Sequence, residues 1–128
     1  MPLPENQIIR LETIQSGYLR IVYPQHITAE SLDDFYSRYL EALKASPQLV
    51  CVVGDFSLTT ETNLKAAMRS ADLLPSTKPY LKKVAVCCLP SFFQNMFLAI
   101  VLISQREDIR IFKTRDDAEA WAYKDMTH

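Results

Sequence analysis

The chain has 128 residues, of which 48% are hydrophobic and 23% charged, and its formal net charge at pH 7 is -1. A chain of this length and composition can form one hydrophobic core that needs no stabilising metal ion or disulfide bond. We therefore expect a single domain over residues 1–128. The charge balance argues against nucleic acid or an anionic membrane as a partner. With only Gly17 and Gly54, the sequence holds no glycine-rich phosphate loop.

The N-terminal sequence and the cysteines indicate a cytoplasmic protein. Residues 1–6 lack the basic and apolar regions of a secretion signal, and the longest apolar stretch, residues 96–103, is far too short to span a membrane. Cys51, Cys87 and Cys88 lie in apolar, strand-like runs, as expected for buried reduced thiols. The alternative is a disulfide from Cys51 to one of the other two, if their strands are neighbours.

The first third of the chain predicts a hairpin and a helix. Residues 7–13 and 18–23 alternate between apolar and polar side chains, and Gly17 lies in the turn between them, which favours a β-hairpin. Large apolar residues then recur at helical spacing over residues 32–43. Thr28 is the expected N-cap of this helix.

The middle of the chain predicts a strand, a helix and a second strand. Residues 49–56 are apolar on both faces, as in a central parallel strand, and a helix starts at about Asn63. We expect residues 75–79, with two prolines, to be a linker, and residues 84–89 to be another buried strand. The expected inward side chains of the helix are Leu64, Ala67, Met68, Ala71 and Leu74.

The last third predicts a helix, a short strand and a closing helix. Ser91 and Gln94 have the spacing of a capping box, and residues 92–103 are apolar on almost every side of the helix they form. Residues 109–112 predict a strand, and Thr114 caps the closing helix. The inward side chains there are Ala118, Trp121 and Ala122. The order β-β-α-β-α-β-α-β-α predicts an α/β domain with a mixed sheet of about five strands and four helices.

Two segments of the chain resemble a known superfamily. The apolar strand ending in Asp55-Phe56-Ser57, and residues 111–122 with their Ala-Glu-Ala-Trp sequence, resemble the STAS/SEC14-like superfamily, which includes the SpoIIAA-like anti-sigma-factor antagonists. The resemblance covers about residues 8–123 and implies a STAS-like fold. In the antagonists, a switch serine stands at the start of the helix after this strand. The corresponding residues 63–65 are Asn-Leu-Lys, without a serine or glycine.

The polar turn after the central strand is the first candidate site. A phosphate on a hydroxyl at a helix N-terminus is stabilised by the helix dipole and the free amides, as a kinase-controlled partner switch requires. The alternative is that these hydroxyls only cap the helix. The candidate switch or partner residues are Asp55, Ser57, Thr59, Thr60 and Thr62.

The third helix is the second candidate site. A helix that is apolar all round must be covered on every side. Its outer face meets a second copy in a homodimer, a partner or a small apolar ligand, unless the linker and the last helix cover it. The candidate dimer or ligand residues are Phe92, Phe93, Met96, Phe97 and Ile100.

No other pattern indicates catalysis or metal binding. His26 and His128 stand alone, so a metal site at either one is not expected, and Cys87 and Cys88 should point to opposite faces of a strand. We therefore expect no catalytic residues, cofactor or metal. The prediction is a non-enzymatic cytoplasmic regulatory or protein-interaction module that forms a homodimer. The alternative is a carrier or sensor of a small apolar ligand, held between the third helix and the sheet.

Overall fold

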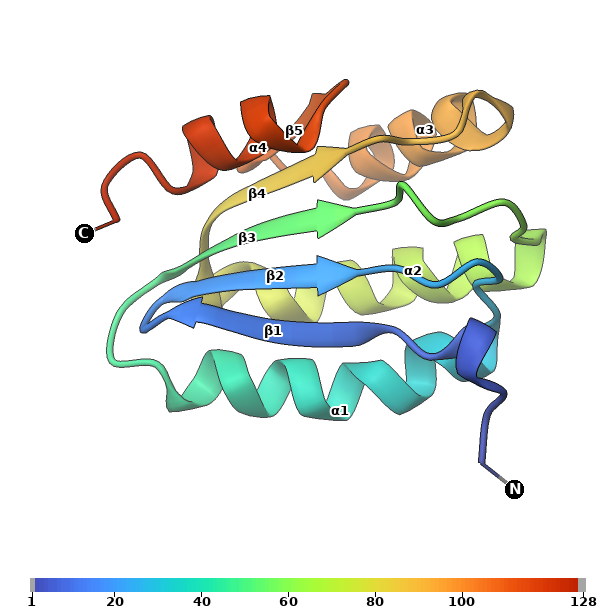
Figure 1. Cartoon of the computed structure of the whole chain (residues 1–128), viewed down its shortest axis with the longest axis horizontal. Helices are drawn as coiled ribbons and strands as arrows, with labels where there is room; N and C mark the ends of the chain where they lie inside the picture. Colours follow the sequence, from blue (N-terminus) through green and yellow to red (C-terminus); the bar gives the residue numbers. More distant parts are fainter. Residues whose placement is uncertain (1, 127–128) are drawn as a thin grey trace.

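Five strands form one twisted sheet in the order β1-β2-β3-β4-β5, with only β1 antiparallel to its neighbour (Figure 1). The computed structural model describes residues 2–126, apart from the side chains of Phe93, Ile103 and Ser104. The predicted mixed sheet is confirmed. The strands are β1 (Arg10–Gln15), β2 (Tyr18–Val22), β3 (Val50–Asp55), β4 (Leu81–Cys87) and β5 (Ile109–Phe112).

Four α-helices are divided unequally between the two faces of the sheet. Residues of α1, α2 and α3 belong to the core on one face, whereas α4 packs against β3 and β4 with the core on the other. In Figure 1, α1 runs below β1, and α2 lies behind the strands. No helix within residues 2–126 is long and apolar enough to cross a membrane. The helices are α1 (Ala29–Ala45), α2 (Leu64–Thr77), α3 (Gln94–Ser104) and α4 (Arg115–Ala122), and short 3-10 turns occupy Glu5–Gln7, Lys78–Tyr80 and Ser91–Phe93.

Because the helices are divided unequally between the two faces of the sheet, the hydrophobic cores on these faces differ in size. The larger core lies under α1, α2 and α3 and contains Phe35, Val52 and Leu43 among its buried side chains. The smaller core lies under α4, where Ala118 and Ala85 are both fully buried. All six residues of β3 are buried because this strand is central and is covered on both faces, as its apolar sequence predicted.

Local sequence accounts for the hairpin and for α1. Gly17 has φ +85°, in the left-handed region that favours glycine, and it closes the predicted turn between β1 and β2. Thr28 caps α1 as predicted, in a reciprocal arrangement with Ser31. The expected apolar face of α1 is buried at Leu32 and Leu43.

The predicted inward face of α2 is wrong at two positions. Leu64 and Met68 are 69% and 62% exposed, whereas Ala66 and Ala67 are buried. The reason is that α2 packs between α1 and α3, where small side chains allow a close approach. Leu64 and Met68 therefore lie on the outer face of the helix.

The predicted linker over residues 75–79 is also wrong, because α2 continues to Thr77 with Pro75 inside it. A proline near the end of a helix removes only one amide donor. The side chains of Thr77 and Arg106 both donate to the Leu74 carbonyl, at 3.1 and 2.9 Å. These bonds fix the last turn of α2 through a contact with a distant segment.

The end of β4 and the start of α3 differ from the prediction as well. The strand is longer at its start, beginning at Leu81, and ends at Cys87 because Cys88 has φ +61°. The predicted capping box does not form. The Gln94 side chain instead donates to the Leu89 carbonyl at 3.2 Å, and a 3-10 turn precedes α3.

Candidate functional site

The turn of residues 55–62 leaves the carboxyl end of β3 and lies beside residues 23–27, which follow β2. The Tyr23 amide donates to the Asp55 carbonyl at 3.0 Å, and the Thr60 amide donates to the Gln25 carbonyl at 2.9 Å. Ligands of open α/β sheets bind at this edge, where parallel strands end. The two segments therefore form one hydrogen-bonded surface at the edge of the sheet where a binding site is expected.

The four hydroxyls of the turn divide into two pairs. Thr59 is buried and donates to the Pro24 carbonyl at 2.8 Å, and Thr62 donates to the Ile27 carbonyl at 3.2 Å. These two hydroxyls hold the turn against residues 23–27. Ser57 and Thr60 are exposed, so they are the two hydroxyls of the turn that another molecule reaches.

The N-cap of α2 is Asn63, whose side-chain oxygen accepts from the Ala66 amide at 2.8 Å. The alternative interpretation, in which the hydroxyls of residues 57–62 cap this helix, is therefore wrong. Asparagine is as good a cap as serine, which explains why the helix starts here.

A groove runs along the same edge of the sheet, between the turn and the N-terminal segment. Its volume is about 660 Å³. Leu58, 55% exposed, and Ile8, 36% exposed, lie on its walls with Val22 and Pro24. Exposed apolar side chains in a concave surface are typical of places where another molecule binds.

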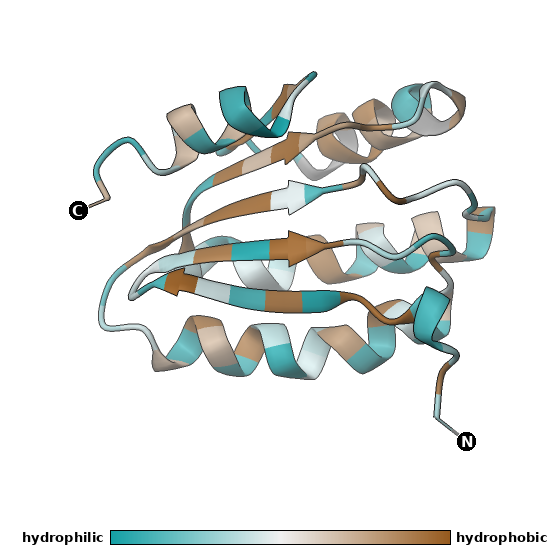
Figure 2. Cartoon of the chain, viewed as in Figure 1, coloured by the Kyte–Doolittle hydropathy of each residue, from teal (hydrophilic) through white to brown (hydrophobic). Residues whose placement is uncertain are grey.

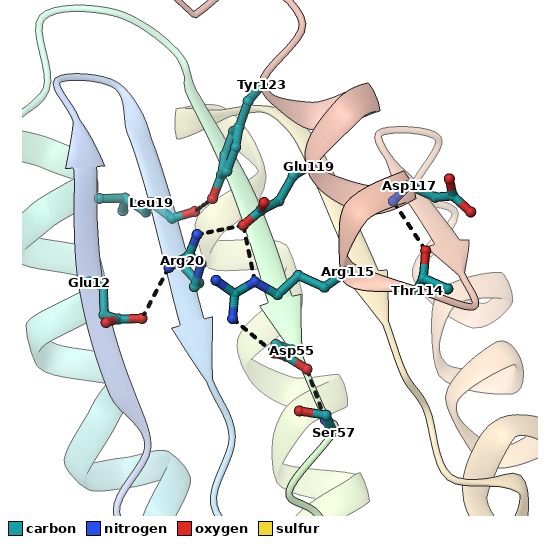
Figure 3. A network of polar contacts seen from close by, with 10 residues as sticks. All are labelled: Glu12, Leu19, Arg20, Asp55, Ser57, Thr114, Arg115, Asp117, Glu119 and Tyr123. Carbon is teal, nitrogen blue, oxygen red and sulfur yellow. Dashed lines mark hydrogen bonds and ion pairs between the residues drawn. The ribbon is translucent and has the colours of Figure 1, made fainter.

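A network of charged side chains that includes Asp55 lies on the α4 side of the sheet (Figure 3). Arg20 on β2 contacts Glu12 at 3.7 Å and Glu119 on α4 at 2.5 Å. Arg115 contacts Glu119 at 3.2 Å and the Asp55 carboxylate at 3.8 Å. These alternating charges connect β1, β2, α4 and the end of β3, and sequence analysis missed them because the partners are far apart in the chain.

Asp55 is also close to two thiols. Asp55 and Cys87 are opposite each other in the register of β3 and β4, and one ligand atom from each of Asp55, Cys87 and Cys88 lies within 4.8 Å of the others. The expectation that Cys87 and Cys88 point to opposite faces is wrong, because the left-handed backbone of Cys88 interrupts the strand alternation. Burial, with the nearby Asp55 charge, raises the pKa of the Cys87 thiol.

All three cysteines are free thiols. Cys51 and Cys87 are buried as predicted, whereas Cys88 is only half-buried. Cys51 pairs with Lys83 in the sheet, whereas Cys87 pairs with Asp55, so the two thiols are separated along the strands by roughly 13 Å at about 3.3 Å per residue. The alternative disulfide from Cys51 to Cys87 or Cys88 is therefore not formed.

The candidate residues of α3 point in different directions. Phe92 is 58% exposed, whereas Met96, Phe97 and Ile100 face the larger core, and Phe93 has its side chain outside the described atoms. The exposed apolar side chains beyond Phe92 are Leu98 and Leu102, 50% and 79% exposed. Figure 2 shows α3 as hydrophobic along most of its length. The exposed apolar residues of this segment therefore include Phe92, which was among the predicted residues, and Leu98 and Leu102, which were not.

A small cavity lies beneath α3, between that helix, α2 and the sheet. Its volume is about 120 Å³, and Tyr23, Phe56, Ala67 and the three inward residues of α3 line it. The Tyr23 ring stacks on Phe56 with centroids 3.9 Å apart, and Phe97 meets Phe56 edge-on at 6.1 Å. The cavity is apolar and well below the roughly 300–1,000 Å³ of usual small-molecule sites.

The chain matches no protein-family model and no curated protein. Its fold is nevertheless similar to solved structures. An uncharacterised protein with a SpoIIAA-like fold from Shewanella loihica PV-4 is 18% identical, with TM-score 0.69 over 95% of this chain and 98% of that one. A STAS domain protein from Planctomyces limnophilus is 16% identical, with TM-score 0.63 over 88% and 94%.

The anti-sigma-factor antagonist SpoIIAA, in its unphosphorylated form, is 9% identical, with TM-score 0.63 over 93% of this chain and 99% of that one. All three structures cover nearly the whole chain, and the mixed five-stranded sheet with four helices agrees with them. This chain therefore has the SpoIIAA-like fold of STAS domains, as its resemblance to that superfamily implied.

Proposed function

We propose that this chain is a non-enzymatic cytoplasmic regulatory module that binds a partner protein through the turn of residues 55–62. The observation that carries the proposal is the apolar groove beside this turn, with Leu58 on its wall. The fold adds support, because one protein that shares it is an anti-sigma-factor antagonist. The hydrogen bonds to residues 23–27 fix the turn, so binding costs little ordering of the backbone.

Regulation through the exposed hydroxyls is part of this proposal. Ser57 and Thr60 lie on the turn, and Thr60 also lines the groove. Phosphorylation adds about two negative charges and strong acceptor oxygens at the modified hydroxyl. Such a charge at the edge of the groove changes which partner surface is complementary to it.

Two exposed leucines at opposite ends of β3 give a matched test of the partner surface. Leu58 and Leu49 are 55% and 53% exposed. In cells of the native host, we expect Leu58→Asp to lose the partner proteins that the wild-type chain retains on affinity purification. Leu49→Asp should keep them. If Leu49→Asp loses the same partners, or Leu58→Asp retains them, the turn is not the docking surface.

Homodimer formation is the second part of the proposal. Its support is the exposed apolar side chains Leu98 and Leu102 on α3, together with exposed Phe92 in the 3-10 turn before this helix. A two-fold dimer is the commonest arrangement for soluble proteins that cover such a face. Native mass spectrometry distinguishes a dimer from a monomer directly, and a Leu102→Asp chain that remains a dimer would exclude this face as the interface.

The cavity beneath α3 favours a second candidate function, as a carrier or sensor of a small apolar ligand. At about 120 Å³ it suits a ligand of about the size of one aromatic ring, since an engineered cavity of about 150 Å³ binds benzene. The same native mass spectra report any bound ligand as added mass. A monomer with a stoichiometric added mass would place this candidate first.

A further inference from the structure

Two thiols and one carboxylate converge at the carboxyl ends of β3 and β4, where the partner turn begins at Asp55. We propose that Asp55, Cys87 and Cys88 bind a soft divalent metal ion such as Zn²⁺. One ligand atom from each residue lies within 4.8 Å of the other two. Thiolates select soft or borderline ions, and three protein ligands with one open position are a common zinc arrangement.

The geometry needs only a small adjustment to hold such an ion. Zinc binds sulfur at about 2.3 Å and oxygen at about 2.0–2.2 Å, so tetrahedral ligand atoms lie roughly 3.5–3.8 Å apart. The observed limit of 4.8 Å is about one ångström longer. Side-chain rotation at Cys88, which is only half-buried, supplies part of that shift and leaves a path for the ion from solvent.

The backbone at Cys88 is the second observation that supports the site. A non-glycine residue with φ +61° is strained, and such strain is concentrated at functional positions. In a regular strand the two neighbouring thiols would point to opposite faces. The left-handed conformation of Cys88 brings its sulfur to Cys87 and Asp55 instead.

The surroundings also suit the charge of the complex. Two thiolates and one carboxylate carry three negative charges, which a divalent ion and the nearby Arg115 neutralise together. The Arg115 guanidinium is 3.8 Å from one Asp55 oxygen, and the Ser57 amide donates to the other at 2.9 Å (Figure 3). Such second contacts orient a ligating carboxylate. Binding replaces the two thiol protons, so each Zn²⁺ releases two protons and no oxidant or reductant is needed.

Cobalt is the probe for the test, because thiolate ligation of Co²⁺ gives an intense charge-transfer absorption. We expect the reduced, metal-free chain of residues 1–128 to bind one Co²⁺ with this absorption, and Zn²⁺ to displace it. Loss of a supporting contact around a metal costs roughly 10- to 100-fold in affinity, so loss of a ligand in Cys88→Ser should cost at least about tenfold.

Two further variants make the test decisive. Cys88→Gly removes the thiol but suits the left-handed backbone, so this chain stays folded while cobalt binding weakens at least as much. Cys51→Ser is the matched control, because its thiol lies on β3 but outside the cluster. The proposal is overturned if the wild-type chain shows no thiolate absorption with Co²⁺, if Cys88→Gly binds as tightly as wild type, or if Cys51→Ser weakens binding equally.

Discussion

The Tyr123 hydroxyl, just after α4, donates a hydrogen bond of 2.5 Å to the Leu19 carbonyl in β2 (Figure 3). This bond joins residues 104 positions apart in the chain. Within residues 2–126, α4 is the single α-helix on its face of the sheet, and this bond is one of the contacts that hold the C-terminal segment in place. The Tyr123 ring also meets Tyr18 edge-on at 5.8 Å.

Replacing Tyr123 with phenylalanine should lower the free energy of unfolding by about 1 kcal/mol, the net value of a typical buried hydrogen bond. The ring contact with Tyr18 is kept, so the hydroxyl alone is tested. Urea unfolding followed by circular dichroism measures the change. Tyr36→Phe is the control, because the Tyr36 hydroxyl makes no hydrogen bond within residues 2–126. Equal stability of the two variants would show that the Tyr123 bond contributes nothing.

The stability of the protein should fall at high pH because of Tyr23. Burial raises the pKa of Tyr23 to about 12. A tyrosine of the unfolded chain ionises near pH 10, so between about pH 10 and 12 the unfolded state loses a proton that the folded state keeps. This contribution is fully present below pH 10, and its loss on the way to pH 12 costs on the order of 2 kcal/mol.

Replacing Tyr23 with phenylalanine should make the decline in stability between pH 10 and 12 less steep. Some decline should remain, because burial also raises the pKa of Tyr39 and of Tyr123. The measurement is the free energy of unfolding in urea at several values of pH for both chains. An identical decline in wild type and Tyr23→Phe would mean that Tyr23 ionises alike in the folded and unfolded states.

Filling the cavity beneath α3 should stabilise the protein. Ala67 lines the cavity, and methionine there adds a flexible apolar side chain that adapts to irregular space. We expect Ala67→Met to raise the free energy of unfolding by up to about 1 kcal/mol. Urea unfolding is the measurement, and Ala71→Met, on the same helix but outside the cavity lining, is the control. If only Ala67→Met destabilises the protein, the cavity has no room for the added side chain, and the prediction is wrong.

The fold class was readable from the sequence because local rules decide most of its elements. Thr28 and Thr114 are caps that act within one helical turn, so α1 and α4 begin where the sequence predicts. The strand at Ile109–Phe112 has its predicted bounds. Apolar residues on both faces of β3 require cover from both sides, and the structure supplies it.

Elements whose form depends on distant contacts were predicted less well. The buried face of α2 is set by its close packing against α1 and α3, which places Leu64 and Met68 outside. Its last turn stays helical despite Pro75 because the Arg106 side chain, far along the chain, donates to the Leu74 carbonyl. Neither contact leaves a periodic signal in the sequence.

For the candidate site, the sequence alone determined the position of the polar turn, because a turn after a buried strand is a local feature. Only the tertiary structure decided which hydroxyls are exposed. The Thr59 hydroxyl, for example, is buried and donates to the carbonyl of Pro24, 35 residues away. It also decided that Cys87 and Cys88 lie together beside Asp55, because strand register and one left-handed residue set that distance. Hydrophobic periodicity and capping act over a few residues, whereas a site is assembled by contacts between segments that the sequence keeps apart.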